Sequence, residues 1–430
     1  MKALSLSLFA CMALAACHRA PVPAPEAKPK SEVPAPPVHV SPEVAAYYGA
    51  VDNRPLWTSA AGPKPEAFAA AERLASAAAD GLDPTRYRAA EVREALEAGR
   101  SGGAKAIARA ELLLSSGWLD YARDVRTVRA NRTLYGEGDL APLPLSAQDA
   151  LEAPPKLNAL YEALRAGYAR WRAKPHGARE EALVRANLDR ARAIQPRERR
   201  YIVVDAASAR LWAIDGDRVE GPMKVIVGKT AMPTPLLASR IRYVVLNPYW
   251  NVPPDLARER AVRVLREGPR VIAAQRLQIL SDWSDAARPI PASAVDWRGV
   301  AAGRKTLRLR QLPGGDNFMG RVKFMMPNPL GVYLHDFPDK SLFARADRRL
   351  SSGCVRLSNA PGLLRWLYRG RPPAPNGRAP EQRVDLAEPV PVYITYLTVL
   401  PGGPEGLTFE ADPYRRDSGG AAPVRRAAED

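Results

Sequence analysis

The sequence predicts an α+β protein in which a helical scaffold domain precedes a mostly-β domain. Residues 41–195 are rich in Ala, Glu and Arg and carry apolar residues such as Phe68 and Leu74 at helical spacing. Near residue 200 the pattern changes to short apolar runs such as 201–205, separated by tight turns such as Asp215-Gly216-Asp217. A chain of 430 residues is long enough for two or three domains.

The scaffold is expected to consist of helices joined by short loops. Gly81-Leu82-Asp83-Pro84 should end one helix, and further helical stretches cover 104–123 and 157–194. A proline-rich piece around 142–155 separates these two stretches. No residue pattern in this part indicates chemistry, so a packing role is the preferred interpretation.

The second domain is expected over 200–411, with a disordered polar tail over 412–430. Segment 254–305 should form a capping segment within this domain. The predicted strands lie at 201–205, 210–214, 223–228, 241–246, 306–310, 331–335 and 390–399, and the predicted helices at 254–268 and 359–369.

The N-terminus indicates export. Met1-Lys2 precedes an apolar run that is too short to span a bilayer, which predicts a signal peptide over 1–16. Leu14-Ala15-Ala16-Cys17 resembles a bacterial lipobox, which implies lipidation of Cys17; an ordinary signal with a chance cysteine is the alternative. A Pro-rich tether follows over 17–40. We therefore expect a periplasmic protein attached to the membrane by its lipid. In lipoproteins of this kind, an Asp directly after the lipidated cysteine retains the protein in the inner membrane. Here His18 follows Cys17, which favours the outer membrane.

The formal net charge of +17 would suit nucleic acid, an anionic membrane or an anionic polymer. However, Arg is scattered through the helical stretches without a long basic block, and no zinc-finger or aromatic RNA-binding signature occurs. An export signal also argues against nucleic acid as a partner. Compositional bias and a role at an anionic surface remain the two open interpretations of the charge.

Counting cysteines and histidines points to one pair. If Cys11 leaves with the signal peptide and Cys17 carries lipid, then Cys354 is the remaining thiol and cannot form an intramolecular disulfide. A catalytic cysteine needs a base, and His335 is the only imidazole in the C-terminal half. The scarcity of His and the absence of HExxH and CxxC patterns predict no zinc site. Chemistry by a cysteine and its base would also need no metal and no organic cofactor. An inert buried thiol is the alternative for Cys354.

Ordered motifs surround this pair. His335-Asp336-Phe337-Pro338 precedes Ser351-Ser352-Gly353-Cys354-Val355-Arg356-Leu357, and the other motifs are Pro233-Thr234-Pro235 and the runs 247–253, 313–317, 322–328 and 332–336. Together they resemble the L,D-transpeptidase family (YkuD-type catalytic domain), in its large subgroup with an N-terminal helical scaffold. Ser352 stands where many relatives have His, and Phe337 where they often have Thr. No convincing match to a small peptidoglycan-binding module occurs between 124 and 200.

The resemblance implies roles for individual residues. Cys354 would attack an amide carbonyl, while His335 would accept the thiol proton and later protonate the leaving amine. The backbone carbonyl of Asp336 would orient the ring, and Gly353 would leave backbone N–H groups free to hold an oxyanion. Arg356 would bind a substrate carboxylate or steady the site; a structural ion pair is the alternative.

Further substrate contacts are expected from Ser352, Tyr333, Trp250 and Asn251. Tyr333 should share a strand face with His335 and line the pocket, although a core position is equally compatible. Trp250 could stack on the substrate or anchor packing. The five arginines at 258, 260, 263, 266 and 270 in the capping segment could meet anionic glycan, but a solvated helix face is slightly favoured.

The resemblance also implies the substrates. These are peptidoglycan stem peptides, with a tetrapeptide donor and a diamino-acid acceptor, and the product is a 3→3 cross-link. Carbapenem inhibitors should acylate Cys354. L,D-carboxypeptidase activity, lipoprotein anchoring at the same site and a non-catalytic wall-binding scaffold lipoprotein are the alternatives.

Overall fold

The computed structural model describes residues 40–128, 140, 145–152 and 157–417, which belong to one compact unit. The predicted signal peptide, the lipidation site Cys17 and nearly all of the tether lie outside these residues. Within the described part of the chain, no helix combines the length and the apolar content needed to cross a membrane.

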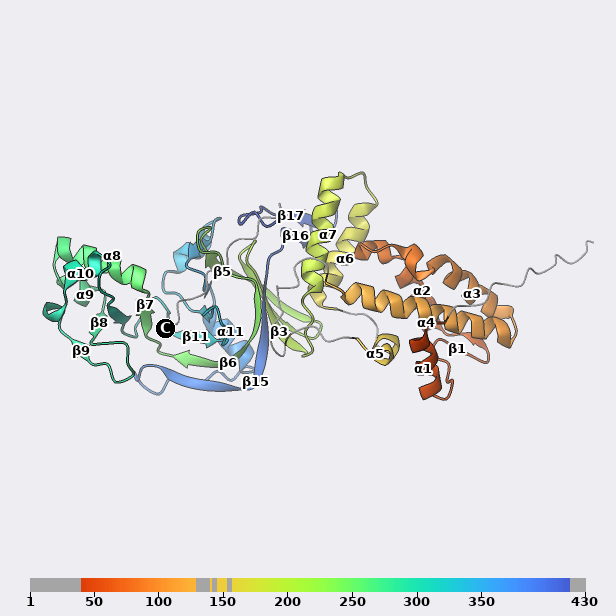
Figure 1. Cartoon of the computed structure of the whole chain (residues 1–430), viewed down its shortest axis with the longest axis horizontal. Helices are drawn as coiled ribbons and strands as arrows, with labels where there is room; N and C mark the ends of the chain where they lie inside the picture. The colour runs from red at the N-terminus through yellow and green to blue at the C-terminus, as the bar shows by residue number, and fades with distance from the viewer. Residues whose placement is uncertain (1–39, 129–139, 141–144, 153–156, 418–430) are drawn as a thin grey trace, which may run out of the picture. The chain divides into compact units, whose positions relative to one another are not determined.

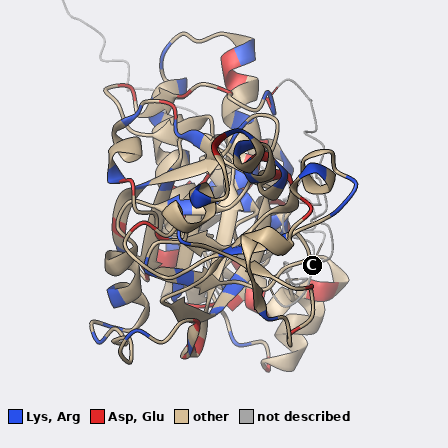
Figure 2. Cartoon of the chain, turned by 90° about the vertical axis from the view of Figure 1, so that its left-hand side faces the viewer, with Lys and Arg blue, Asp and Glu red and all other residues tan. Residues whose placement is uncertain are grey.

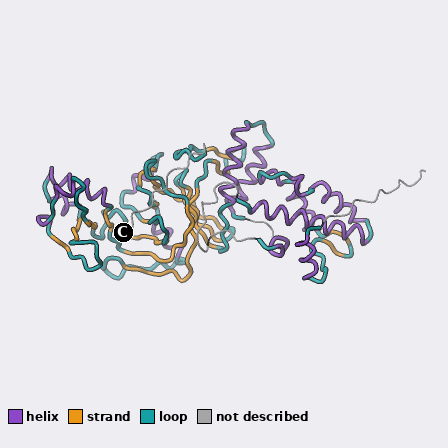
Figure 3. The backbone as a smooth tube through the Cα atoms, viewed as in Figure 1, coloured by secondary structure: helices purple, strands orange, loops and turns teal. Residues whose placement is uncertain are grey.

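Helices build the N-terminal part, as predicted, with a short β1–β2 hairpin between the first two (Figures 1 and 3). The elements are α1 (Pro42–Ala50), β1 (Thr58–Ser59), β2 (Gly62–Pro63), α2 (Pro65–Ala75), η1 (Ala77–Asp80), η2 (Pro84–Tyr87), α3 (Ala89–Ser101), α4 (Ala104–Arg126), α5 (Ala147–Glu152), α6 (Ala159–Arg172) and α7 (Ala178–Arg192). The prediction of one helical stretch over 157–194 was incomplete, because α6 ends before Pro175 and α7 begins after Gly177. Proline lacks the N–H that a continuous helix would need there.

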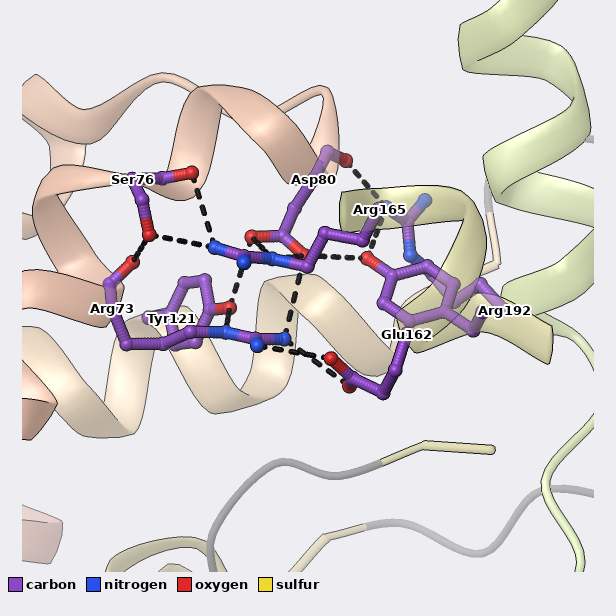
Figure 4. A network of polar contacts seen from close by, with 8 residues as sticks. Arg73, Ser76, Asp80, Tyr121, Glu162, Arg165 and Arg192 are labelled. Carbon is purple, nitrogen blue, oxygen red and sulfur yellow. Dashed lines mark hydrogen bonds and ion pairs between the residues drawn. The ribbon is translucent and has the colours of Figure 1, made fainter. Parts of the chain in front are cut away.

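A buried carboxylate ties these helices together (Figure 4). Asp80 is 1 % exposed, at the end of η1, where Gly81 turns the chain at φ +71°. Its carboxylate accepts hydrogen bonds from Tyr121 of α4 (3.0 Å) and Tyr161 of α6 (2.8 Å), and from Nε of Arg165 (2.9 Å). Because a buried charge is tolerated only when it is paired and hydrogen-bonded, this network fixes η1 against α4 and α6.

The C-terminal part is built on a nine-stranded sheet with the order β13-β5-β14-β12-β11-β6-β15-β3-β4. The last strand, β4, also pairs with β5, so the sheet closes on itself. The strands are β3 (Arg200–Asp205), β4 (Arg210–Asp215), β5 (Arg218–Gly228), β6 (Leu237–Leu246), β11 (Val322–Met325), β12 (Leu334–His335), β13 (Arg349–Ser351), β14 (Val355–Leu357) and β15 (Gln382–Thr395).

Alternation along these strands separates a core face from an outer face. Val225, Val227, Leu334 and Val355 all lie in the main apolar core, which the helix α11 (Ala360–Leu367) completes through Leu363. The residues between them therefore point to the other face of the sheet. That face carries the candidate site.

The capping segment predicted over 254–305 is more than helical. It lies in a capping subdomain, residues 250–311, with its own four-stranded sheet and its own apolar core. Its elements are β7 (Trp250–Val252), α8 (Pro254–Glu267), α9 (Arg270–Ala274), β8 (Leu277–Leu280), β9 (Pro289–Ile290), η4 (Ala292–Ala294), α10 (Trp297–Ala301) and β10 (Arg308–Gln311). The chain enters this subdomain after β6 and returns into β11; β6 pairs with β11, and β7 pairs with β10.

The last described residues pack against both the scaffold helices α6 and α7 and the nine-stranded sheet. Val399–Pro401 (β16) and Leu407–Phe409 (β17) form a hairpin, and Tyr414 beyond it is buried, with its hydroxyl donating to the Gly228 carbonyl. Asp417 forms an ion pair with Arg190 of α7 (2.6 Å). The prediction of disorder from residue 412 was therefore wrong for 412–417, because a polar composition conceals these buried contacts; residues 418–430 lie outside the described chain.

Candidate active site

Strand register places the two candidate catalytic residues on the same face of the sheet. The strand β12 pairs in parallel with β14, with Leu334 opposite Val355 and His335 opposite Arg356. Just before these strands, the Val355 N–H donates to the Tyr333 carbonyl (3.2 Å), which places Tyr333 beside Cys354. Because Leu334 and Val355 face the core, the register puts His335, Arg356, Tyr333 and Cys354 on the opposite face.

His335 is held as a neutral base. Its side chain is buried, and Nδ1–H donates to the backbone carbonyl of Asp336 (2.5 Å). A carbonyl can only accept, so this contact leaves Nε2 as the unprotonated nitrogen. Burial, with the positive charge of Arg356, lowers the pKa of His335 to about 3. The imidazole therefore carries no proton on Nε2 across the physiological pH range.

Asp336 orients the ring through its backbone while its carboxylate is occupied elsewhere. The carboxylate accepts from Lys340 Nζ (2.7 Å) and from the Arg321 N–H (3.0 Å), and the Asp336 N–H donates to the Val322 carbonyl (2.9 Å). These contacts fix the peptide whose carbonyl holds His335. The geometry matches the orienting contact expected from the sequence.

Cys354 is half-buried and uncharged at rest. Its Sγ lies 4.0 Å from the Gly331 carbonyl, and no hydrogen bond between Sγ and His335 occurs in the described structure. Burial raises the pKa of the thiol, while hydrogen bonding to Tyr333 and the charge of Arg356 oppose that shift. Both groups are therefore expected to be neutral at rest, and do not form the ion pair that a simple thiolate mechanism would need.

Two hydroxyl groups shape the turn that presents Cys354. Ser351 Oγ donates to the Cys354 carbonyl (2.7 Å) and accepts from the Gly353 N–H (3.1 Å). Thr234 Oγ1 donates to the Gly353 carbonyl (2.8 Å) and accepts from the Gly228 N–H (2.9 Å). Gly353 itself has φ +124°, a conformation that side chains rarely allow.

This turn corrects one sequence-based expectation. The Gly353 N–H is not free for an oxyanion, because Ser351 accepts its hydrogen bond. The N–H of Cys354 finds no acceptor in the described part of the chain and is the available donor. Neither Thr234 nor Ser351 had been given a role from the sequence, although the Pro233-Thr234-Pro235 motif had drawn attention to the first.

Arg356 is supported by a ring and not by a carboxylate. Its Cζ lies 4.3 Å from the centroid of the Phe337 ring, and its Nε is buried without an acceptor. No ion pair joins Arg356 to an acidic side chain of the described residues. The alternative of a structural ion pair therefore has no partner in this part of the chain.

The four other residues that were predicted to contact the substrate differ in their exposure and their neighbours. Ser352 is exposed on the turn and Asn251 is exposed on β7. The Tyr333 ring lies 5.8 Å from that of His335, and its hydroxyl contacts Met319 Sδ (3.6 Å). Trp250 is buried in the core of the capping subdomain, stacked on Phe318 at 4.4 Å. Its ring is therefore a packing anchor, as the second interpretation held, and is not open to a ligand.

The distribution of charged residues and of possible metal ligands also bears on the sequence-based expectations. Figure 2 shows Lys and Arg scattered among Asp and Glu, without one continuous basic block. Within the described residues, no group of three or more His, Cys, Asp and Glu side chains is placed to hold a metal ion.

Comparison with known proteins identifies both parts of the chain. Residues 199–386 match the family model of the L,D-transpeptidase catalytic domain. This part of the chain is an L,D-transpeptidase catalytic domain. Residues 42–172 match the family model named Scaffold domain, so the L,D-transpeptidase domain follows a scaffold of the predicted kind.

Individual proteins are similar to parts of this chain. A Haemophilus influenzae protein named "Putative L,D-transpeptidase" is 34% identical over 184 residues, which are 43% of this chain and 36% of the relative. The chain thus spans about a third of the length of this curated relative. An L,D-transpeptidase from Mycobacterium smegmatis (14% identity, TM-score 0.22, 46% of this chain and 58% of that one) is also similar. The Ldtfm-avibactam carbamoyl enzyme is similar as well (14% identity, TM-score 0.22, 47% of this chain and 51% of that one).

Proposed function

We propose that this chain is a peptidoglycan L,D-transpeptidase that forms 3→3 cross-links between stem peptides through a cysteinyl acyl-enzyme. The observation that supports this most is the β12–β14 register, which places Cys354 and His335 on one sheet face. The ring of His335 is anchored through Nδ1, which leaves Nε2 as the base. A cysteine, an anchored base and an unused backbone N–H are the parts that acyl transfer requires.

The first half-reaction forms the acyl-enzyme. Sγ of Cys354 attacks the carbonyl at the L-centre of the third residue of a tetrapeptide donor, and its proton passes to Nε2 of His335. The Cys354 N–H donates to the oxyanion; one such donor contributes about 3 kcal/mol. Collapse of the tetrahedral intermediate breaks the C–N bond, and His335 returns the proton to the departing D-Ala amine.

The second half-reaction transfers the acyl group. The side-chain amine of an acceptor stem attacks the thioester while His335 removes its proton. The new amide is released, and the proton returns to the thiol of Cys354. Because both groups are neutral at rest, transfer of the thiol proton accompanies nucleophilic attack instead of preceding it. Arg356, on the same face, stabilises the negative charge that develops on sulfur.

Acylation by a carbapenem tests the chemistry. Incubation of the whole chain should add one inhibitor mass, and the adduct should map to the peptide that contains Cys354. Cys354→Ala should show no adduct while keeping its melting temperature. A folded wild-type protein without an adduct, or an adduct that persists in Cys354→Ala, would contradict the proposal.

Wall analysis tests the product. Cells expressing the wild-type chain should contain 3→3 dimers in their wall digests, and cells expressing Cys354→Ala should lack them. Trimmed tripeptides without dimers would assign the site to L,D-carboxypeptidase activity instead. Dimers at equal abundance in both strains would contradict cross-linking by this chain.

We also propose that the protein works in the periplasm, attached by lipid on Cys17. The support is the lipobox-like sequence before this residue, which lies outside the described structure. Cys17→Ala should move the protein from the membrane fraction to the soluble periplasmic fraction. An unchanged membrane fraction would argue against lipid attachment.

A further inference from the structure

Arg356 has a support that is unusual for a guanidinium in a partly buried position. Buried arginines are normally paired with carboxylates, because an unpaired charge is costly. Here the guanidinium makes no ion pair and no hydrogen bond with any described residue, and Nε is buried. Its Cζ lies 4.3 Å from the centroid of the Phe337 ring.

The Phe337 ring is itself fixed on its other sides. It is 4 % exposed and packs in a small apolar cluster with Ile226 and Phe343. Phe318 meets it edge to face (5.8 Å, 76°), and Phe318 in turn stacks on Trp250 of the capping subdomain (4.4 Å, 20°). The ring under Arg356 therefore has little freedom to move.

A ring and a carboxylate support an arginine differently. A carboxylate orients the guanidinium and neutralises it, whereas an aromatic face orients it by cation–π attraction and leaves its net charge intact. This charge lies opposite His335 in the register and two residues beyond Cys354. The site thus retains one oriented positive charge that no acidic side chain of the described protein compensates.

We propose that Phe337 is a positioning residue that holds Arg356 ready for a free carboxylate of the donor stem peptide. The enzyme consequently selects donors that carry this carboxylate over donors in which it is an amide. This inference rests on the proposed transpeptidase function. It adds a requirement on substrate chemistry, and it gives a purpose to the buried ring of Phe337.

Paired donors test the selectivity. Two tetrapeptide stems that differ only in carboxylate or carboxamide at the diamino acid are compared by kcat/KM for release of D-Ala. Arg356→Gln should reduce the preference of the wild-type enzyme for the carboxylate donor by roughly 10- to 100-fold, because a charged hydrogen-bonding partner is lost. Phe337→Leu should reduce it by about tenfold, mainly through KM, and Phe337→Tyr should restore it to within about twofold of wild type.

Phe343→Leu is the matched control. Phe343 is also 4 % exposed and lies in the same cluster, but its ring is approached by Lys340 (5.5 Å) and not by Arg356. This variant should keep the wild-type donor preference. Equal losses in Phe337→Leu and Phe343→Leu would show that packing alone matters and would overturn the proposal, as would an unchanged preference in Phe337→Leu.

Carbapenem adduct formation separates this inference from the proposed function. If wild-type enzyme and Phe337→Leu both form the Cys354 adduct while the donor preference is absent in both, the transpeptidase function stands and the role of Phe337 is wrong. If the wild-type protein forms no adduct, the proposed function itself fails, and the inference fails with it.

Discussion

The scaffold and the catalytic face treat buried charge in opposite ways. In the scaffold, Asp80 is fully enclosed, and every contact of its carboxylate is with a tyrosine hydroxyl or a guanidinium. On the catalytic face, Arg356 rests on a ring without a counter-ion, and His335 is buried in its neutral form. The first arrangement stabilises the fold. In the second, no acidic side chain of the described residues neutralises Arg356, so its positive charge remains available to a substrate. The difference indicates which charges serve stability and which serve chemistry.

The largest expected effect is on the catalytic side. His335→Gln should lower kcat/KM for D-Ala release by about 10²- to 10⁴-fold, because Nε2 is lost as the general base. Circular dichroism and the thermal transition should show a folded protein. An activity within tenfold of wild type would show that another group accepts the thiol proton.

A substitution in the scaffold should lower stability and leave activity nearly unchanged. Asp80→Ala leaves Nε of Arg165 and two tyrosine hydroxyls without their acceptor, which should lower the free energy of unfolding by about 3–5 kcal/mol. Below the melting transition, donor turnover should remain close to wild type. Denaturant titration of the whole chain measures the first effect, and a D-Ala release assay measures the second.

A surface pair provides the control for this prediction. Arg88 and Glu91 form an exposed ion pair (2.5 Å) on α3 and its N-cap, so Glu91→Ala should cost less than about 1 kcal/mol. A loss of stability in Asp80→Ala no larger than in Glu91→Ala would contradict the importance of the buried network.

The pH dependence sharpens the comparison. Because the pKa of folded His335 is lowered to about 3, the folded protein takes up this proton only near pH 3, whereas the unfolded imidazole takes it up near its ordinary pKa of 6.5. The free energy of unfolding should therefore decrease as the pH falls from 6.5 towards 3. His335→Gln should remove this part of the slope, and equal slopes in the two proteins would refute the neutral buried imidazole.

The thiol gives an independent pH test. Burial raises the pKa of Cys354, so the rate of its alkylation by iodoacetamide should still be increasing above pH 8. A resting thiolate–imidazolium pair would instead give a rate plateau near neutral pH. Such a plateau would contradict the neutral thiol that its burial predicts.

The last prediction concerns the turn that presents Cys354. Thr234→Val removes the hydroxyl that links the Gly353 carbonyl to the Gly228 N–H, and it should cost about 1–3 kcal/mol of stability. Activity should also fall, because the turn that presents Cys354 loses a support. Thr234→Ser keeps the hydroxyl and should retain most of both properties; equal behaviour of the two variants would argue against this role.

Local patterns in the sequence predicted part of this fold. The sequences of β3, β4 and β6 contain apolar runs that are long enough to identify buried strands. The first half of β5 and the start of β15 are exposed and polar, so no apolar run marks them. The sheet of the capping subdomain consists of strands of two to four residues, which are stabilised by pairing and not by their own sequence.

Site residues of scarce types could be predicted from the sequence, whereas contacts between residues that are distant in the sequence could not. Cys354 and His335 could be singled out because the C-terminal half holds one thiol and one imidazole. The contact of Thr234 with Gly353 joins residues 119 positions apart, and nothing local to either residue indicates it. The occupied N–H of Gly353 likewise depends on how the turn folds around Ser351.

The attachment of the capping subdomain has a consequence for modularity. The chain departs at Leu246 and resumes at Val322, and these two residues lie directly opposite each other on adjacent antiparallel strands. Everything between them is therefore a hairpin loop enlarged into a folded body. A tight two-residue connection grafted at this point would link β6 directly to β11 and yield a miniature enzyme that keeps Cys354 and His335 but loses Phe318 and Trp250, the two rings that stack beyond Phe337.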